Sequence, residues 1–233
     1  MSYARYAIYF GPRPGSELHN FGLEWLGTDP ETGRDTNWRP LPGFTPETHS
    51  DLVSAPRRYA LHGTLKPPFR LADGRDIDGL RRATELLSGR SRAIVLPPPV
   101  LKRLGGFMAL CPAEPSQTLA QLAAACVMEL DDFRASAPAA ELDRRRASGL
   151  TARQDGYLTE WGYPYVLEDF RFHVTLTRRL DRQEADRIEP ALRERLRPVL
   201  EQPLQIDDLC IYGEPPVGAP YRIVDRFALQ SAA

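Results

Sequence analysis

Two short stretches of the chain alternate between apolar and polar residues in the same way. They cover residues 59–66 and 171–177, and each carries His-x-Thr-Leu at its centre. Alternation places the His and the Thr on one face of a β-strand and the apolar residues on the other. Two of the chain's four histidines, His62 and His173, occupy this frame. The repeat predicts a duplicated fold in which each half supplies one imidazole.

Helical patterns and capping signals separate further stretches that are typical of strands. The spacing of apolar residues and the caps predict helices over 16–26, 45–53, 77–88, 116–133, 151–161 and from 181 to about 196. Pro190 lies inside the last of these and should kink or split it. Short runs rich in β-branched, aromatic or alternating residues predict strands over 3–10, 57–66, 92–97, 100–111, 169–178, 203–212 and 220–229.

The same order of elements follows both motifs: a His-x-Thr strand, a helix, a strand and another strand. We therefore expect an α+β fold, a single bilobal domain over 1–233 with pseudo-twofold symmetry. Lobe 1 covers about 1–133, a partly helical linker covers about 134–149, and lobe 2 covers about 150–233. Each lobe should have an antiparallel sheet with helices on its outer face, and the two His-x-Thr strands should face a central cleft.

Composition narrows the range of functions. The chain has 233 residues, 42% of them hydrophobic, and a net charge of −1, so no overall positive field attracts long nucleic acid. The three cysteines have no spacing typical of a zinc site or a disulfide framework. The N-terminus lacks the pattern of a signal peptide, and no apolar run approaches the roughly 20 residues of a membrane span. We expect a cytoplasmic protein without a metal or another cofactor, and the sequence does not predict its oligomeric state.

Both predicted cleft faces combine an imidazole with a hydroxyl and a cation. On these faces the first strand presents His62, Thr64 and Lys66, and the second presents His173, Thr175 and Arg171. Imidazole titrates near pH 6.5, so one histidine can take a proton from water while the other gives one to a departing oxygen. The hydroxyls, with Lys66 or Arg171, would bind the non-bridging oxygens of a phosphodiester. Near-symmetric motifs do not decide which histidine is the acid and which is the base.

Other readings of the same residues stay open. Each histidine is a structural strand residue in one alternative, and both bind a metal in another, although suitably spaced carboxylates or cysteines are not evident. Tyr163 and Tyr165, near Pro164, are candidates for stacking on a base or sugar, whereas core packing explains most aromatics in this region. The long loop over 28–45 is a candidate lid.

The paired motifs resemble those of the 2H phosphoesterase superfamily, which includes bacterial 2′-5′ RNA ligase-like proteins and cyclic nucleotide phosphodiesterases. Further segments resemble, more narrowly, a family encoded in phosphonate-utilisation operons; they are 58–69, 150–154, 161–165, 170–177, 213–214 and 219–221. The resemblance implies a bilobal fold, a metal-free site and phosphodiester chemistry. It also implies that His62 and His173 are catalytic and that Thr64 and Thr175 contact phosphate.

The sequence thus predicts a metal-independent phosphodiesterase that acts on a small cyclic phosphodiester. A ribose cyclic phosphate formed in phosphonate catabolism is the substrate that the resemblance suggests. One alternative is an RNA-end enzyme, either a 2′,3′-cyclic phosphodiesterase or a 2′-5′ ligase. Another is a non-catalytic module that binds phosphate or RNA. The expected partner is a small phosphorylated molecule, with no membrane, and an RNA fragment is the less favoured alternative.

Overall fold

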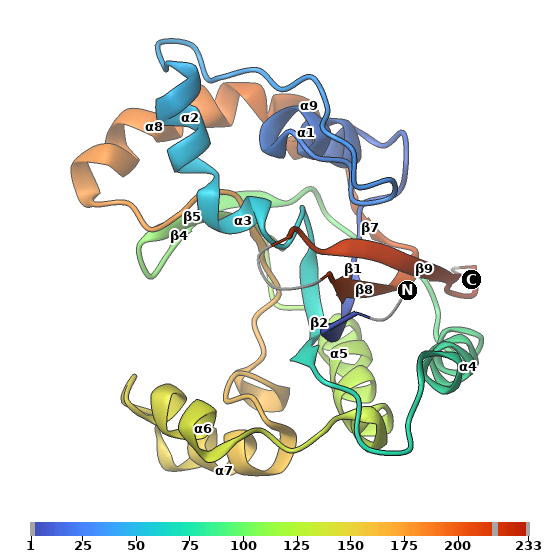
Figure 1. Ribbon diagram of the computed structural model, residues 1–233. Coiled ribbons are helices and arrows are strands. Elements are labelled where there is room, and N and C mark those ends of the chain that lie inside the picture. The colour runs from blue at the N-terminus through green and yellow to red at the C-terminus, as the bar shows by residue number, and fades with distance from the viewer. Residues whose placement is uncertain (1–2, 216–218, 232–233) are drawn as a thin grey trace.

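A seven-stranded antiparallel sheet forms the centre of the protein. The computed structural model describes residues 3–215 and 219–231. The strands lie in the order β4-β5-β6-β2-β1-β8-β9 (Figure 1), and each is antiparallel to its neighbours. They are β1 (Arg5–Phe10), β2 (Gly63–Phe69), β4 (Val100–Leu104), β5 (Phe107–Cys111), β6 (Val174–Thr175), β8 (Asp208–Glu214) and β9 (Arg222–Ala228). Two further strands, β3 (Ile94–Leu96) and β7 (Leu204–Ile206), form a separate antiparallel pair.

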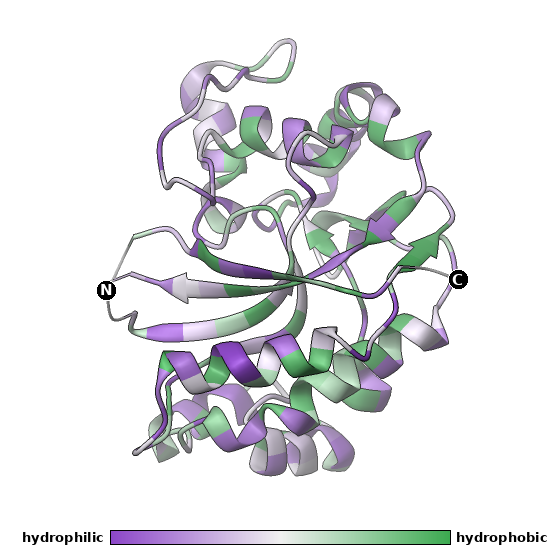
Figure 2. Ribbon diagram, turned by 90° about the vertical axis from the view of Figure 1, so that its right-hand side faces the viewer, coloured by the Kyte–Doolittle hydropathy of each residue, from purple (hydrophilic) through white to green (hydrophobic). Residues whose placement is uncertain are grey.

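Helices cover one face of the sheet and bury its apolar side chains. Five of the helices that contribute to this core are α1 (Glu17–Leu26), α4 (Ile77–Ser88), α5 (Gln117–Glu129), α8 (Arg182–Arg195) and α9 (Arg197–Leu200). In Figure 2, apolar and polar bands alternate along the helices, as expected when each helix has one buried face. The expected α+β class, with antiparallel strands and helices packed on the sheet, is confirmed.

The remaining helical segments lie at the two ends of the strands. They are α2 (Pro46–Leu52), α3 (Ser54–Arg57), α6 (Ala139–Arg146), α7 (Ala152–Trp161) and the 3₁₀ turns η1 (Asp131–Phe133) and η2 (Leu167–Asp169). Figure 1 shows α6 and α7 side by side, away from α2 and α3. The loop over 28–45 is held in place by several contacts; for example, the Trp38 ring stacks on His49.

Local capping signals start the helices where the sequence predicts. The Thr45 hydroxyl accepts a hydrogen bond from the Thr48 amide, and Thr151 and Asp181 each form a complete capping box. These bonds satisfy amides that would otherwise lack partners in the first turn. The sequence predicted that Pro190 kinks or splits its helix. The split is wrong, because α8 continues through Pro190.

Both predicted His-x-Thr strands are shorter than expected. Residues 54–57 form helix α3, and β2 starts only at Gly63. Between them Ala60 has a φ of 58°, a left-handed conformation that interrupts the alternation assumed for 57–66. On the second motif, β6 covers only Val174–Thr175, and the turn η2 with Leu167 at φ 52° precedes it.

The two motif strands are neighbours within one sheet, which refines the expected arrangement of two lobes around a cleft. β2 pairs with β6 at Gly63 and Val174. Strands from the two sequence halves also mix, because β1 pairs with β8 and β5 pairs with β6. The proposed division into lobes with a linker over 134–149 stays a prediction about the repeat in the sequence.

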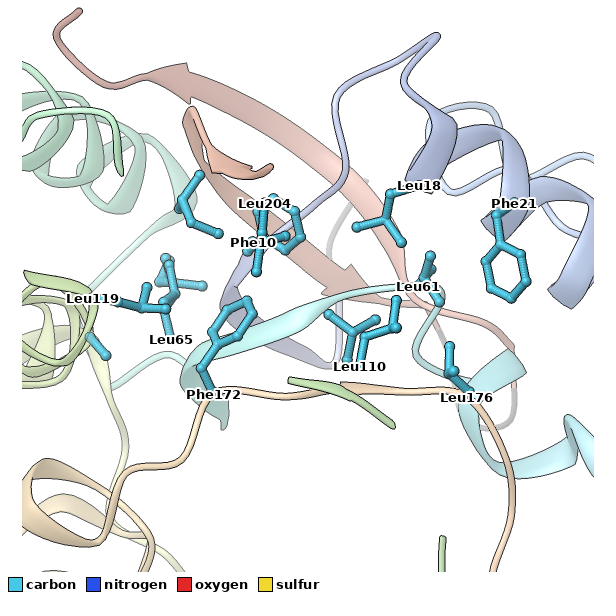
Figure 3. Packing of buried hydrophobic residues seen from close by; sticks show 14 of the residues in the cluster. Phe10, Leu18, Phe21, Leu61, Leu65, Leu110, Leu119, Phe172, Leu176 and Leu204 are labelled. Carbon is cyan, nitrogen blue, oxygen red and sulfur yellow. The ribbon is translucent and has the colours of Figure 1, made fainter. Parts of the chain in front are cut away.

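Close packing at Gly63 holds these strands together. A Cβ atom at position 63 would overlap the Phe172 ring, so only glycine leaves room for that ring. Phe172, in the segment just before β6, points toward Phe10 (Figure 3), and the two ring centroids are 5.8 Å apart. The apolar side of the junction between β2 and β6 is therefore a well-filled part of the core.

We predict that Gly63→Ala lowers the free energy of unfolding by roughly 1–3 kcal/mol, because the added methyl group displaces the Phe172 ring. Gly156→Ala in α7 is the control, since no atom lies within 4 Å of its Cβ position. Gly156→Ala should raise the free energy of unfolding by roughly 0.5–1 kcal/mol. Denaturant unfolding measures both, and a Gly63→Ala variant as stable as the wild type would contradict this account of the junction.

Candidate active site

The β2–β6 pairing brings both motifs onto the face of the sheet opposite the helix-covered core. With Gly63 opposite Val174, extending the register by one residue places His62 beside Thr175 and His173 beside Thr64. Directly opposed residues point to the same side of a sheet, and diagonal neighbours have Cα atoms about 7–8 Å apart. The two imidazoles therefore lie diagonally across one strand junction, each beside the threonine of the other motif.

Both imidazole rings are anchored in the same way. The Nδ1 atom of His62 lies 2.9 Å from the Ala60 carbonyl oxygen, and that of His173 lies 2.8 Å from the Arg171 carbonyl oxygen. A carbonyl oxygen only accepts, so Nδ1 carries the proton and Nε2 is the free nitrogen. The left-handed turn at Ala60 belongs to this arrangement, since it precedes the carbonyl that holds His62.

The surroundings of the two rings differ. His62 stacks on Tyr9, with ring centroids 3.9 Å apart and an angle of 22° between the planes. Burial lowers the pKa of His62 to about 4 and outweighs the Ala60 carbonyl, which raises it; His173 lowers it further. That last effect is electrostatic and is consistent with the diagonal placement of the two imidazoles. His62 is therefore neutral at pH 7, with a lone pair on Nε2.

Two threonine hydroxyls stand beside the imidazoles. Thr64 and Thr175 are half-buried, and within residues 3–215 and 219–231 neither hydroxyl has a hydrogen-bond partner. A hydroxyl group has one donor proton and can rotate to direct it. The structure thus brings together the four residues on which the two sequence motifs are centred.

Lys66 does not belong to this group. Its ammonium is buried, donates to the Val127 carbonyl at 2.9 Å and to Asp131 at 3.0 Å, and lies 5.4 Å from the centre of the Phe69 ring. The strict alternation that placed Lys66 beside Thr64 fails because β2 has an extra residue here. From Thr64 to Lys66, β2 advances two positions, whereas the paired strand β1 advances only one, from Tyr9 to Ile8. The ammonium consequently points to Asp131 rather than to the histidines.

The other predicted binding residues lie nearer the site. Arg171 is exposed, and its carbonyl holds His173. The Tyr163 ring is 5.0 Å from the Arg145 guanidinium and 5.7 Å from the Tyr165 ring. Tyr163 also contributes, after burial and two other tyrosines, to raising the pKa of Tyr9, so it approaches the aromatic group around His62. Tyr165 lies farther out, with 45% of its surface exposed.

Several residues at the site were not predicted from the motifs. The aromatic group beside His62 consists of Tyr9, Tyr59, Tyr212 and Tyr221. Alternation along β1 puts Tyr9 on the same face as Arg5, and this pattern was the signal by which the sequence could have indicated that Tyr9 lies at the site. Which strand lies beside β1 is non-local information, however, and the sequence did not reveal it.

A carboxylate farther along this face holds two arginines. Glu214 accepts hydrogen bonds from Arg58 at 2.7 Å and from Arg5 at 3.1 Å, and it is 4% exposed. Burial alone would raise the pKa of Glu214, but the two guanidinium groups outweigh burial and lower it to about 2. The Tyr221 hydroxyl lies 3.3 Å from the same carboxylate. Glu214 thus links β8 to β1 and to the segment that leads into the first motif.

Among the described residues no group of three or more His, Cys, Asp or Glu side chains is placed to hold a metal ion. In that part of the chain no helix has the length and apolar character needed to cross a membrane.

Comparison with known proteins assigns the family. Residues 64–222 match the family described as "Protein of unknown function (DUF1045)". The chain belongs to this family. Two curated relatives are both named ribose 1,5-bisphosphate phosphokinase PhnN. The protein from Janthinobacterium sp. (strain Marseille) is 38% identical and the one from Laribacter hongkongensis (strain HLHK9) is 34% identical, each over 94% of this chain.

The chain spans about half the length of these relatives, 49% and 50%. The phosphate-binding signature of many kinases contains a Gly-Lys pair. Neither of the two lysines in this chain follows a glycine. Among solved structures, E. coli LigT with 3′-AMP and LigT with phosphate cover 98–99% of this chain at 16% and 13% identity, with TM-scores of 0.45 and 0.44. These scores are below the level that demonstrates a common fold, and the family assignment rests on the sequence match.

We predict that Lys66→Met lowers stability by roughly 3 kcal/mol, because the change leaves the buried Val127 carbonyl and part of Asp131 without their partner. Binding of inorganic phosphate should be unchanged. Chemical unfolding and titration calorimetry measure the two quantities. Normal stability combined with loss of phosphate binding would show that Lys66 acts at the site after all.

Acid should remove the contribution of Glu214 to stability. The folded-state pKa of about 2 is below the usual value of 4.5, so the carboxylate stabilises the fold above about pH 4.5 and this contribution disappears as the pH falls toward 2. Glu214→Gln should lower the free energy of unfolding at pH 7 by up to about 3 kcal/mol. Its stability should also change less between pH 4.5 and pH 2 than that of the wild type. Parallel curves for both proteins would contradict the assignment.

Proposed function

We propose that this protein is a metal-independent phosphodiesterase that hydrolyses a small cyclic phosphodiester. The observation that supports this most is the pair of imidazoles at one strand junction, each with Nδ1 held by a backbone carbonyl and Nε2 free. Phosphodiester hydrolysis requires one group that removes a proton from water and one that protonates the leaving oxygen. Two imidazoles that flank one phosphorus atom supply both groups.

His62 is the general base in this proposal and His173 the general acid. The packing of His62 under Tyr9 and its low pKa keep the ring neutral, so Nε2 accepts a proton from the attacking water. A bond forms between the water oxygen and phosphorus, and the bond from phosphorus to one ring oxygen breaks. Protonated His173 donates the Nε2 proton to that oxygen. The product is a phosphomonoester with a new hydroxyl group.

Thr64 and Thr175 are the proposed ligands of the non-bridging phosphate oxygens. Each hydroxyl lies beside the histidine of the other motif through the β2–β6 register. Donors directed at these oxygens stabilise the negative charge that develops around phosphorus. Arg171, exposed beside His173, is the proposed cation at the rim. Lys66 is not a phosphate ligand in this proposal, because its ammonium already binds Asp131 and the Val127 carbonyl.

The proposed substrate is a ribose cyclic phosphate of phosphonate catabolism. The net charge of −1 favours a small anion over a long nucleic acid. The printed name of the two relatives concerns a ribose that carries two phosphates, and their similarity covers 94% of this chain. A nucleoside 2′,3′-cyclic phosphate at an RNA end is the second candidate, favoured by the exposed Tyr165 beside Tyr163, where a base could stack.

We expect hydrolysis of ribose 1,2-cyclic phosphate, with or without a 5-phosphate, in the presence of a chelator. His62→Ala and His173→Ala should each lower kcat/KM by about 10²–10⁴-fold. In the wild type, kcat/KM should fall as the pH drops through about 4, because protonated His62 cannot accept a proton. The His62→Ala variant should lose this acidic limb.

His19→Ala is the matched control. His19 lies in α1 on the helix-covered side of the sheet, so this substitution should leave the rate unchanged. Nucleoside 2′,3′-cyclic phosphates, assayed in parallel, identify the substrate class. Loss of activity on adding chelator, or normal rates in both histidine variants, would refute the two-histidine mechanism.

A further inference from the structure

Lys102 projects onto the same face of the sheet as the two histidines. It lies in β4 opposite Ala109 of β5, and Ala109 lies opposite Thr175 of β6. Directly opposed residues share a face. Lys102, Ala109 and Thr175 therefore form a row across three strands, and the extended register continues this row to His62.

The neighbour of Lys102 in the chain supports this orientation. The Arg103 guanidinium lies 2.6 Å from Asp186 and 2.7 Å from Glu189, both in α8 on the helix-covered face. Successive residues of a strand point to opposite faces. Arg103 points to the helices, so Lys102 points to the open face that carries the site.

The ammonium of Lys102 is available to bind an anion. Lys102 is exposed, and within residues 3–215 and 219–231 no carboxylate pairs with it. The chain has only one other lysine, Lys66, which is buried in its ion pair with Asp131. Beside Lys102, Ala109 presents only a methyl group, so no long β5 side chain stands between the lysine and Thr175 in this row.

Electrostatics indicate the direction in which the ammonium lies. Burial raises the pKa of the Cys111 thiol, and Lys102 counteracts this shift, so the charge is close to Cys111. Pairing of Leu110 with Val174 places Cys111 next in register to His173. An ammonium near Cys111 lies over β5, beside the row that continues to His173.

Strand spacing fixes the scale of this arrangement. The middle of the β2–β6 junction lies two and a half strand spacings from β4, roughly 12 Å. A lysine side chain reaches about 6 Å. The ammonium thus remains roughly 6 Å from a phosphorus atom between the histidines. This distance is too long for an ion pair with the phosphate held there. It is comparable to the separation of two phosphates on one sugar.

We infer that Lys102 binds a second phosphate group of the substrate and so selects doubly phosphorylated sugars. This inference rests on the proposed function, since it takes the reacting phosphate to lie between His62 and His173. Lys102 is a binding residue in this account and takes no part in proton transfer. Its removal should weaken the binding of bisphosphorylated sugars and spare that of monophosphorylated ones.

The test compares ribose 2-phosphate with ribose 2,5-bisphosphate as stable ligands in titration calorimetry. Wild-type protein should bind the bisphosphate more tightly, and Lys102→Met should weaken that binding by about 10–100-fold with little effect on the monophosphate. Lys102→Arg should restore part of the preference. Arg197→Met, which removes an exposed positive charge on α9, is the control and should behave like the wild type.

Each result decides the inference. An equal loss for both ligands, an effect on neither ligand, or no binding of the bisphosphate by the wild type would overturn it. The binding readout is independent of turnover. If the wild type hydrolyses no cyclic phosphate but Lys102→Met still weakens only bisphosphate binding, the proposed reaction fails while the second phosphate site stands.

Discussion

Strands β2 and β6 meet at Gly63 and Val174, and the Phe172 ring occupies the space that a side chain at position 63 would need. The two motifs are distant in the sequence, and this pairing makes them neighbours. On its apolar side the junction is filled by the core. On its other side it presents two imidazoles and two hydroxyls, and a slip of one residue would turn the histidine and the threonine of the slipped strand toward the core.

The two halves of the site are alike in covalent pattern but differ in environment. Each Nδ1 is held by the carbonyl two residues earlier in the chain, which leaves Nε2 free. Over residues 3–215 and 219–231, His62 is the one of the two that stacks on a tyrosine, and burial keeps its ring neutral. In the proposed mechanism, this difference in environment divides the roles of base and acid between two groups that the sequence makes look equivalent.

Local signals made much of the fold predictable. Capping residues such as Thr151 and Asp181 act within one helical turn, so the sequence alone locates the helix starts. Strand partners are non-local. Neither the position of both motifs in one sheet nor the stacking of Tyr9 on His62 follows from either motif by itself. Lys66 shows the limit most clearly, since one extra residue in β2 reverses a face assignment that strict alternation would make.

Both motifs together should hold one phosphate group. A crystal structure of the protein with inorganic phosphate should show one anion at the β2–β6 junction, within hydrogen-bond distance of Nε2 of His62 and His173 and of the hydroxyls of Thr64 and Thr175. An anion that contacts only one motif, or that binds elsewhere while the junction contains only water, would show that the two motifs do not form one phosphate site.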